Sequence, residues 1–264
     1  MKNLSLTFAA LLVLAACARV EPFTFVQMSD TQIGFMDRSE GYAHSDTLMK
    51  KAVAEVNALD PALVVLTGDL IDEPYNTVQD SIYRVRIAEL QAPLHLLPGN
   101  HDIKPFNTEN HAHYVAWRGY DRFSFREKGC AFIGFDSNCI QDGAEEFEAA
   151  QFAWLRDELR KARRARYTFV FLHCPVIRGS MDEAEDHFNF TMPKRAQYLD
   201  LFKQYGVDAV FAGHCHQDYA GEYEGIRLCT AGPVGRALGR ARSGYHVIRV
   251  DRDDFTVTYV PTQI

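Results

Sequence analysis

The chain has 264 residues, a formal net charge of −7 at pH 7, and 47% hydrophobic against 24% charged residues. Its length suits one large α/β domain, and it contains no internal repeat, low-complexity tract or linker. The negative charge argues against general nucleic-acid binding, which needs a positive footprint, while bound metals can still supply a local positive pocket.

The N-terminus predicts an export signal. Lys2 precedes an apolar stretch over residues 4–16, which is too short to span a bilayer comfortably and ends at Cys17. Leu-Ala-Ala-Cys at 14–17 resembles the lipobox of bacterial lipoproteins, in which the cysteine becomes the lipidated first residue. The alternatives are a plain signal peptide and a buried N-terminal helix. We therefore predict a signal peptide over 1–17, one domain over 22–264, and export to the bacterial cell envelope with a membrane anchor on Cys17.

Strand-like and helical stretches alternate along the domain. Short apolar runs predict strands at 23–28, 62–66, 94–97, 167–172 and 208–211. Apolar residues at helical spacing predict a helix at 46–59 capped by Asp46, one at 77–90 with Val78 and Val85 on its apolar face, and one at 145–162. After residue 216 the pattern indicates antiparallel strands at 219–223, 226–230, 245–250 and 255–260, with hairpin turns at 224–225 and 253–254. This order predicts an α/β fold.

A loop with polar side chains follows each of the five apolar strands. The loops read Asp30-Thr31-Gln32, Gly68-Asp69-Leu70-Ile71-Asp72, Gly99-Asn100-His101-Asp102, His173-Cys174-Pro175 and Gly213-His214-Cys215-His216. Their side chains include metal ligands and a proton carrier. In open α/β sheets, ligands bind beyond the carboxyl ends of the strands, so we expect these five loops to converge on one crevice.

These five blocks, in this order, resemble those of the calcineurin-like metallophosphoesterase family: Asp-x-His, Gly-Asp-x-x-Asp, Gly-Asn-His-Asp/Glu, a lone His and Gly-His-x-His. They extend from Asp30 to His216, most of the chain. One position departs, since Gln32 stands where most members have His. A protein phosphatase-like branch of the family shares this Gln and a Phe-Asn segment like that at 187–190. The resemblance implies two packed mixed β-sheets flanked by helices, an α/β/β/α sandwich of the metallophosphoesterase type.

The resemblance also implies a dinuclear metal centre, with a hydroxide shared by the two cations as the attacking oxygen. Asp30, Gln32, Asp69 and His216 would hold one divalent cation, and Asp69, Asn100, His173 and His214 would hold the other. His101 would protonate the leaving oxygen or stabilise the transition state, Asp102 would orient His101, and Asp72 would support the ligands from behind. Mn, Fe, Zn and Mg are the candidate metals, and an amide oxygen at Gln32 favours Mn.

These residues predict a dinuclear-metal-dependent phosphoester hydrolase that acts on a phosphorylated substrate, foremost as a phosphomonoesterase. A phosphodiesterase or nucleotide hydrolase would use the same blocks. A non-catalytic, metal-bearing binding lipoprotein is the third hypothesis, which the intact His101-Asp102 pair disfavours. Residues that cover the crevice, expected within 34–46, 103–120 and 178–192, would decide the substrate. The sequence leaves the oligomeric state open.

Other residues admit both a functional and a structural interpretation. The basic run at 160–166 could contact anionic lipid, and we interpret it instead as the solvated end of a helix. His111 and His113 resemble a second metal pair, but we expect them on an exposed loop. Arg236 and Arg240 either reach the substrate or lie on the surface. Cys174 and Cys215 are expected to be small buried residues, and six Cys without regular spacing predict no disulfide framework.

Overall fold

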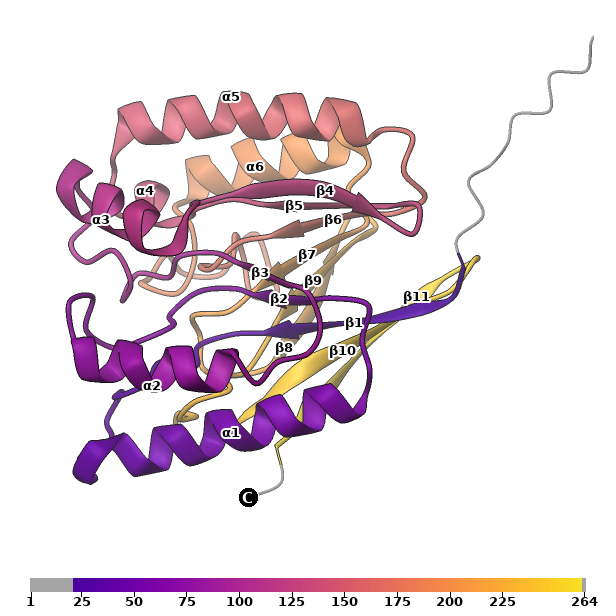
Figure 1. Ribbon diagram of the computed structural model, residues 1–264. Helices are drawn as coiled ribbons and strands as arrows, with labels where there is room; N and C mark the ends of the chain where they lie inside the picture. The colour runs from indigo at the N-terminus through magenta and orange to yellow at the C-terminus, as the bar shows by residue number, and fades with distance from the viewer. Residues whose placement is uncertain (1–20, 263–264) are drawn as a thin grey trace, which may run out of the picture.

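The computed structural model describes residues 21–262 as two β-sheets packed face to face between two layers of helices (Figure 1). The first sheet has the strand order β11-β10-β1-β2-β3, with β1 (Phe23–Met28), β2 (Val64–Leu66), β3 (Leu94–Leu96), β10 (Gly244–Val250) and β11 (Phe255–Pro261). The second has the order β4-β5-β6-β7-β9-β8, with β4 (Phe123–Glu127), β5 (Cys130–Gly134), β6 (Thr168–Phe171), β7 (Ala209–Ala212), β8 (Tyr219–Tyr223) and β9 (Ile226–Thr230). Both sheets mix parallel and antiparallel pairs, so the predicted sandwich is confirmed.

Helices cover the outer face of each sheet (Figure 1). On the first sheet lie α1 (Ala43–Ala58) and α2 (Thr77–Ile87), and on the second lie α5 (Glu145–Ala162) and α6 (Met192–Tyr205). Shorter elements are η1 (Glu40–Tyr42), α3 (Thr108–Arg118) and α4 (Asn138–Gln141). Within 21–262 no helix has both the length and the apolar content needed to cross a bilayer. The predicted signal peptide and the anchor on Cys17 lie outside the described residues.

Side chains on alternate faces of the central strands build separate hydrophobic cores. Phe25 of β1 and Phe169 of β6 meet between the sheets, with ring centroids 5.3 Å apart. Their neighbours Val26 and Val170 face the helices on either side. Strands covered on both faces must be apolar on both, which explains the near-continuous apolar runs in the sequence. These buried strands fix the positions at which the polar loops begin.

The apolar face predicted for the second helix is wrong. Val78 and Val85 are each 54% exposed, whereas Gln79 and Tyr83 are buried. The side chain of Gln79 lies where a Cβ at Gly34 would sit, and its Oε1 accepts a hydrogen bond from the backbone N–H of Glu73 at 2.9 Å. A polar residue is therefore buried because it ties two loops together, which apolar periodicity does not reveal.

Two local predictions also need correction. The first helix begins at Ala43, and Asp46 is inside it, where its carboxylate pairs with Arg86 at 2.5 Å. His111 and His113 lie half-buried on α3 and not on an exposed loop, and His111 Nε2 lies 2.9 Å from an Asp121 oxygen.

Candidate metal centre

The loops that follow β1, β2, β6 and β7 converge. Two groups of side chains form there, one of Asp69, His173 and His214 and the other of Asp30, Asp69 and His216. In each group, ligand atoms of the three residues lie within 4.8 Å of one another, and every member is buried. Asp69 belongs to both groups, which places it where a carboxylate would bridge two cations.

The backbone at these positions is strained. Asp30, Gln32, Asp69, His214 and His216 all have positive φ, with values of 50°, 32°, 51°, 69° and 50°. A residue with a Cβ in the left-handed region costs on the order of 1 kcal/mol, so such residues are usually isolated. Five of the seven predicted ligands share this conformation, which indicates that the surrounding structure holds these side chains in place for a purpose other than stability.

Each predicted histidine ligand has one ring nitrogen on a backbone carbonyl. The pairs are His173 Nδ1 with Thr67 O at 2.7 Å, His214 Nε2 with His187 O at 2.8 Å, and His216 Nδ1 with Arg236 O at 2.7 Å. A carbonyl only accepts, so these nitrogens carry the proton. The opposite nitrogen of each ring is the one that would ligate a cation, which is the usual arrangement of metal-binding imidazoles.

Two oxygens at the site have no hydrogen-bond partner in the described part of the chain. Asp30 Oδ1 and Gln32 Oε1 are buried and make no hydrogen bond to any residue within 21–262. The amide nitrogen of Gln32 donates to Asp72 Oδ1 at 3.3 Å, which turns the amide oxygen the other way. A buried oxygen without a partner costs about 1–3 kcal/mol, and a divalent cation would remove that cost. Carboxylate, amide and imidazole donors together suit divalent metals, so the residues fit two cations.

The charges of the site also favour cations. Burial raises the pKa of Asp30, which means that the ionised carboxylate needs positive charge nearby. At Asp69 burial acts in the same direction, but the charge and hydrogen bond of His173 outweigh it and hold the pKa of Asp69 well below its usual range. Burial lowers the pKa of His173, but Asp69 overcomes this effect and raises it to about 10. Burial keeps His214 neutral, with its pKa lowered to about 3, and neutral imidazole is the form that binds metal.

Asn100 and His101 reach the same two residues from the loop after β3. Asn100 Oδ1 lies 3.0 Å from His173 Nε2, and the backbone N–H of His101 donates to Asp69 Oδ1 at 2.8 Å. A Cβ at Gly99 would lie 2.1 Å from Asp69 Oδ1, so glycine is required where the two loops meet. All seven predicted ligands therefore lie on loops that contact one another.

The partner of the His101 ring differs from the expectation. His101 Nδ1 lies 2.9 Å from the backbone oxygen of Asp72 and 3.0 Å from Asp72 Oδ1. Burial lowers the pKa of His101, but Asp72 and the charge of Asp69 together raise it to about 9. Asp72, not Asp102, therefore orients the imidazole.

Asp102 instead holds the loops together. Its carboxylate accepts hydrogen bonds from the backbone N–H of Gly99 at 2.8 Å and of Leu70 at 3.0 Å. Burial, followed by the charge of Asp69, raises the pKa of Asp102 to about 7. Two oxygens that point at backbone amides cannot also turn toward the His101 ring, because the residue is fully enclosed between the loops.

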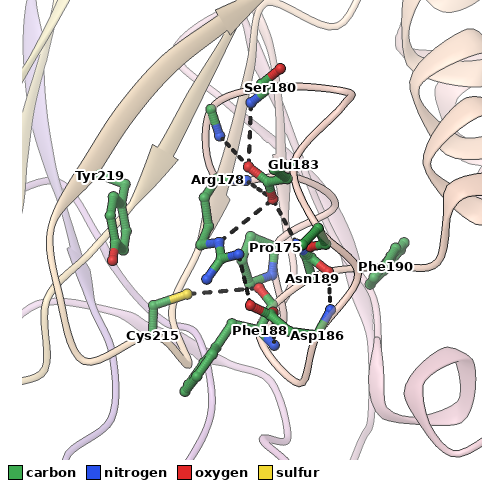
Figure 2. Close-up of polar contacts among 12 residues, drawn as sticks. Pro175, Arg178, Ser180, Glu183, Asp186, Phe188, Asn189, Phe190, Cys215 and Tyr219 are labelled. Carbon is green, nitrogen blue, oxygen red and sulfur yellow. Dashed lines mark hydrogen bonds and ion pairs between the residues drawn. The ribbon is translucent and has the colours of Figure 1, made fainter.

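Residues 178–190 form a folded segment beside His214. The sequence predicted that this region helps to cover the crevice, but not its internal contacts. Glu183 accepts hydrogen bonds from the backbone N–H groups of Arg178 and Gly179 and from the Asn189 amide, and Asp186 pairs with the Arg178 guanidinium at 2.9 Å (Figure 2). The ring centroids of His187 and His214 are 4.6 Å apart. The contact to the metal ligand is made by the His187 carbonyl, and a backbone group leaves no signature in a sequence.

A fully buried arginine on α6 anchors this segment. Arg195 donates to the backbone oxygens of four residues: Phe190 at 2.7 Å, Met181 at 2.9 Å, Glu183 at 2.6 Å and Ala184 at 3.2 Å. Four carbonyls can satisfy a guanidinium in the absence of a paired carboxylate. The segment, and with it the His187 carbonyl, is thereby held in one conformation.

The remaining predicted residues have the following places. The carbonyl of Arg236 binds His216, and its guanidinium donates to Met36 O at 2.9 Å, while Arg240 is exposed on the same loop. Cys174 and Cys215 are buried, and the five cysteines within 21–262 are all free. On α5, Arg160 and Lys161 pair with Asp157 and Glu158, as suits a solvated helix end.

Comparison with known proteins adds independent findings. Residues 23–218 match the family model of calcineurin-like phosphoesterases. The bovine serine/threonine-protein phosphatase CPPED1 is 31% identical over 260 residues, which cover 90% of this chain and 83% of that protein, and the human protein of that name is 30% identical over 261 residues with the same coverage. A probable glycerophosphodiester phosphodiesterase GpdQ from Arcobacter nitrofigilis is 26% identical over 211 residues, 73% of this chain and 71% of that protein.

Solved structures show the same fold. A dimetal phosphatase from Danio rerio superposes with a TM-score of 0.69 at 15% identity, over 91% of this chain and 96% of that one. A purple acid phosphatase from yellow lupin also gives 0.69 at 15% identity, over 94% of this chain and 53% of that one.

Proposed function

This chain belongs to the calcineurin-like phosphoesterase family, and within that family we propose that it is a phosphomonoesterase whose substrates are phosphorylated serine or threonine side chains. The resemblance seen in the five sequence blocks is confirmed. The chain is a metal-dependent phosphoester hydrolase with candidate ligands for two divalent cations. The proposal on substrate draws on the phosphatases that are about 30% identical over 90% of the chain.

One observation carries the catalytic part of the proposal: Asp69 is common to two buried ligand groups. Asp30, Gln32, Asp69 and His216 would hold one cation, and Asp69, Asn100, His173 and His214 the other. When bound, two such cations neutralise phosphate charge and activate water. Gln32 offers a hard oxygen in place of an imidazole, so we propose Mn²⁺ as the preferred metal.

His101 is placed to supply a proton to the leaving group. The Nδ1 atom of its ring is held by Asp72, so Nε2 is left to carry a proton to the departing oxygen. The backbone N–H of His101 is fixed on Asp69, which ties the position of the acid to the position of the bridging carboxylate. Asp102 keeps the Gly99 and Leu70 loops in register, and it acts on catalysis through that positioning alone.

A turnover panel tests this function. The protein, supplied with Mn²⁺, is assayed on p-nitrophenyl phosphate, bis-p-nitrophenyl phosphate, nucleotides and phosphoserine and phosphothreonine peptides. We expect the monoesters and phosphopeptides to give the highest kcat/KM. Preference for the diester would instead favour phosphodiester hydrolysis, for which the similarity to a probable glycerophosphodiester phosphodiesterase is the supporting observation.

We also propose that the mature protein is exported and held at the bacterial envelope by lipid on Cys17. The support is sequence alone: an apolar stretch that ends in Leu-Ala-Ala-Cys at 14–17. Cys17→Ser should release the protein from membranes or leave its precursor uncleaved. Identical fractionation and migration of the substituted and native chains would contradict the anchor.

A further inference from the structure

A polar pocket separate from the predicted metal ligands lies at the start of α1. It has a volume of about 350 Å³ and is lined by His44, Leu48, Arg236, Ala237, Ala241, Arg242, Ser243 and Thr262. The residues that line it include two arginines, one histidine, one serine and one threonine, and no aspartate or glutamate. A pocket of this size can hold a small ligand, and its polar groups are those that recognise an anion.

Several hydrogen-bonding groups of the residues that line this pocket have no partner in the described part of the chain. The Arg242 guanidinium makes no hydrogen bond and no ion pair to any residue within 21–262. The Arg236 guanidinium makes one hydrogen bond, from Nη1 to Met36 O. Thr262 is 3% exposed, and its hydroxyl oxygen is buried without any partner in the described part of the chain. Buried hydroxyls are nearly always paired in folded proteins, so this one has hydrogen-bonding capacity to offer a ligand at the pocket that Thr262 lines.

The acidic residue Asp37 follows Met36, whose backbone oxygen accepts the hydrogen bond from Arg236. The Asp37 carboxylate accepts four hydrogen bonds from the backbone and hydroxyl groups of Ser39 and Ser45. Among the described residues, it forms no ion pair with Arg236 or Arg242. The positive charge of Arg236 and Arg242 remains available to a ligand, and guanidinium groups bind phosphate and carboxylate with two parallel hydrogen bonds.

The wall of the pocket is continuous with the metal centre. The Arg236 carbonyl accepts from His216 Nδ1 at 2.7 Å, and the neighbouring Gly235 N–H donates to the Asp30 backbone oxygen at 2.9 Å. Ser243, which lines the pocket, donates to the Gly235 carbonyl at 2.5 Å. The segment that presents the arginines is thus the one that supports two of the predicted metal ligands.

From these contacts we propose that the pocket binds a second anionic group, a phosphate or carboxylate, next to the metal centre. The anion is either part of the substrate, on the side remote from the scissile bond, or a free ion such as the inorganic phosphate that hydrolysis releases. The link to the reaction rests on the proposed function, while anion binding in the pocket does not.

The first test is a calorimetric titration of the metal-loaded full chain with inorganic phosphate. We expect two phosphate sites in the native protein, with the second weakened by about 10-fold to 100-fold in Arg242→Ala, the usual effect of losing hydrogen bonds from a charged donor. Arg240→Ala is the matched control, because Arg240 is exposed on the same loop but does not line the pocket. Thr262→Val removes the unpaired hydroxyl at nearly constant volume and should also weaken the second site.

The second test separates the two sources of the anion. If the anion belongs to the substrate, Arg242→Ala should raise KM for carboxyphenyl phosphate by about tenfold or more relative to phenyl phosphate, with little change in kcat. If the anion is free, the two substrates respond alike and the titration alone changes. Equal phosphate binding by the native chain, Arg242→Ala and Thr262→Val overturns the proposal. A chain that binds phosphate twice but hydrolyses no monoester would instead refute the proposed function and leave the pocket standing.

Discussion

Replacing Arg195 with Met should destabilise the segment 178–190, whose His187 carbonyl contacts His214. The guanidinium is fully buried and donates to four backbone oxygens, of Phe190, Met181, Glu183 and Ala184, at 2.6 to 3.2 Å. A hydrogen bond from a charged donor contributes about 1.5–3 kcal/mol, so four could total roughly 6–12 kcal/mol. The segment can open locally and expose these carbonyls to water, which limits the loss. We therefore expect a destabilisation of about 3–5 kcal/mol, because several buried carbonyls lose their donor.

The assay combines urea unfolding with hydrogen exchange. Arg195→Met should lower the midpoint, increase amide exchange across 178–190, and weaken binding of the cation held by Asp69, His173 and His214 by about 10-fold to 100-fold, because the His187 carbonyl no longer fixes the His214 ring. Lys203→Met is the control, since Lys203 lies on the same helix but pairs with Glu224 at the surface. If both variants unfold at the same midpoint and exchange across 178–190 is unchanged, the anchoring role of Arg195 is wrong.

Three further predictions concern other residues. His101→Ala should keep its metal content, but its kcat should fall by about 10²–10⁴-fold. Full activity at equal metal content would contradict the role of His101 in proton transfer. Gln32→His should tighten metal binding and shift preference from Mn²⁺ toward Zn²⁺ or Fe, whereas unchanged affinities in a metal titration would mean that other contacts set the metal. Burial opposes ionisation of Asp37, but hydrogen bonds from Ser39 and Ser45 lower its pKa from 3.8 to about 2. The ionised form therefore stabilises the fold above pH 3.8, and that stabilisation is lost as the pH falls toward 2. Asp37→Asn should show a shallower loss of stability over this range in acid-unfolding curves, and a slope equal to that of the native chain would contradict this contribution.

The core strands and the hairpins were predictable because their residues are apolar and bounded by turns. The strands at 23–28, 219–223 and 226–230 and the helix at 145–162 have the bounds predicted from the sequence. The helices α3 and α6 and the β4–β5 hairpin had no expected counterpart. In α6 the buried residues do recur at helical spacing, but they include Arg195 while Met192 is exposed, so the apolar pattern of the sequence does not mark the buried face. Tertiary packing decides such elements.

At the site, the sequence located the side chains but not their partners. Asp72 and Asp102 both follow a motif strand at similar distances, and only the fold shows that Asp72 meets the His101 ring while Asp102 meets backbone amides. The carbonyls of Thr67, His187 and Arg236, which fix the three predicted histidine ligands, belong to residues of unrelated types. Backbone contacts depend on loop conformation, which residue identity does not encode.

The measurement that tests the central claim most directly is metal content and turnover of the native chain beside Asp69→Asn. Asp69 belongs to both ligand groups, and its two oxygens lie 2.8 Å from His101 N and 3.4 Å from His173 Nε2. The amide is nearly the same size, so loss of the bridging charge is the main change. We predict two Mn²⁺ per native chain and loss of both metal and phosphomonoester turnover in Asp69→Asn. Native turnover that persists after chelation, or an Asp69→Asn chain with full metal content and full activity, would contradict a shared carboxylate at a two-cation centre.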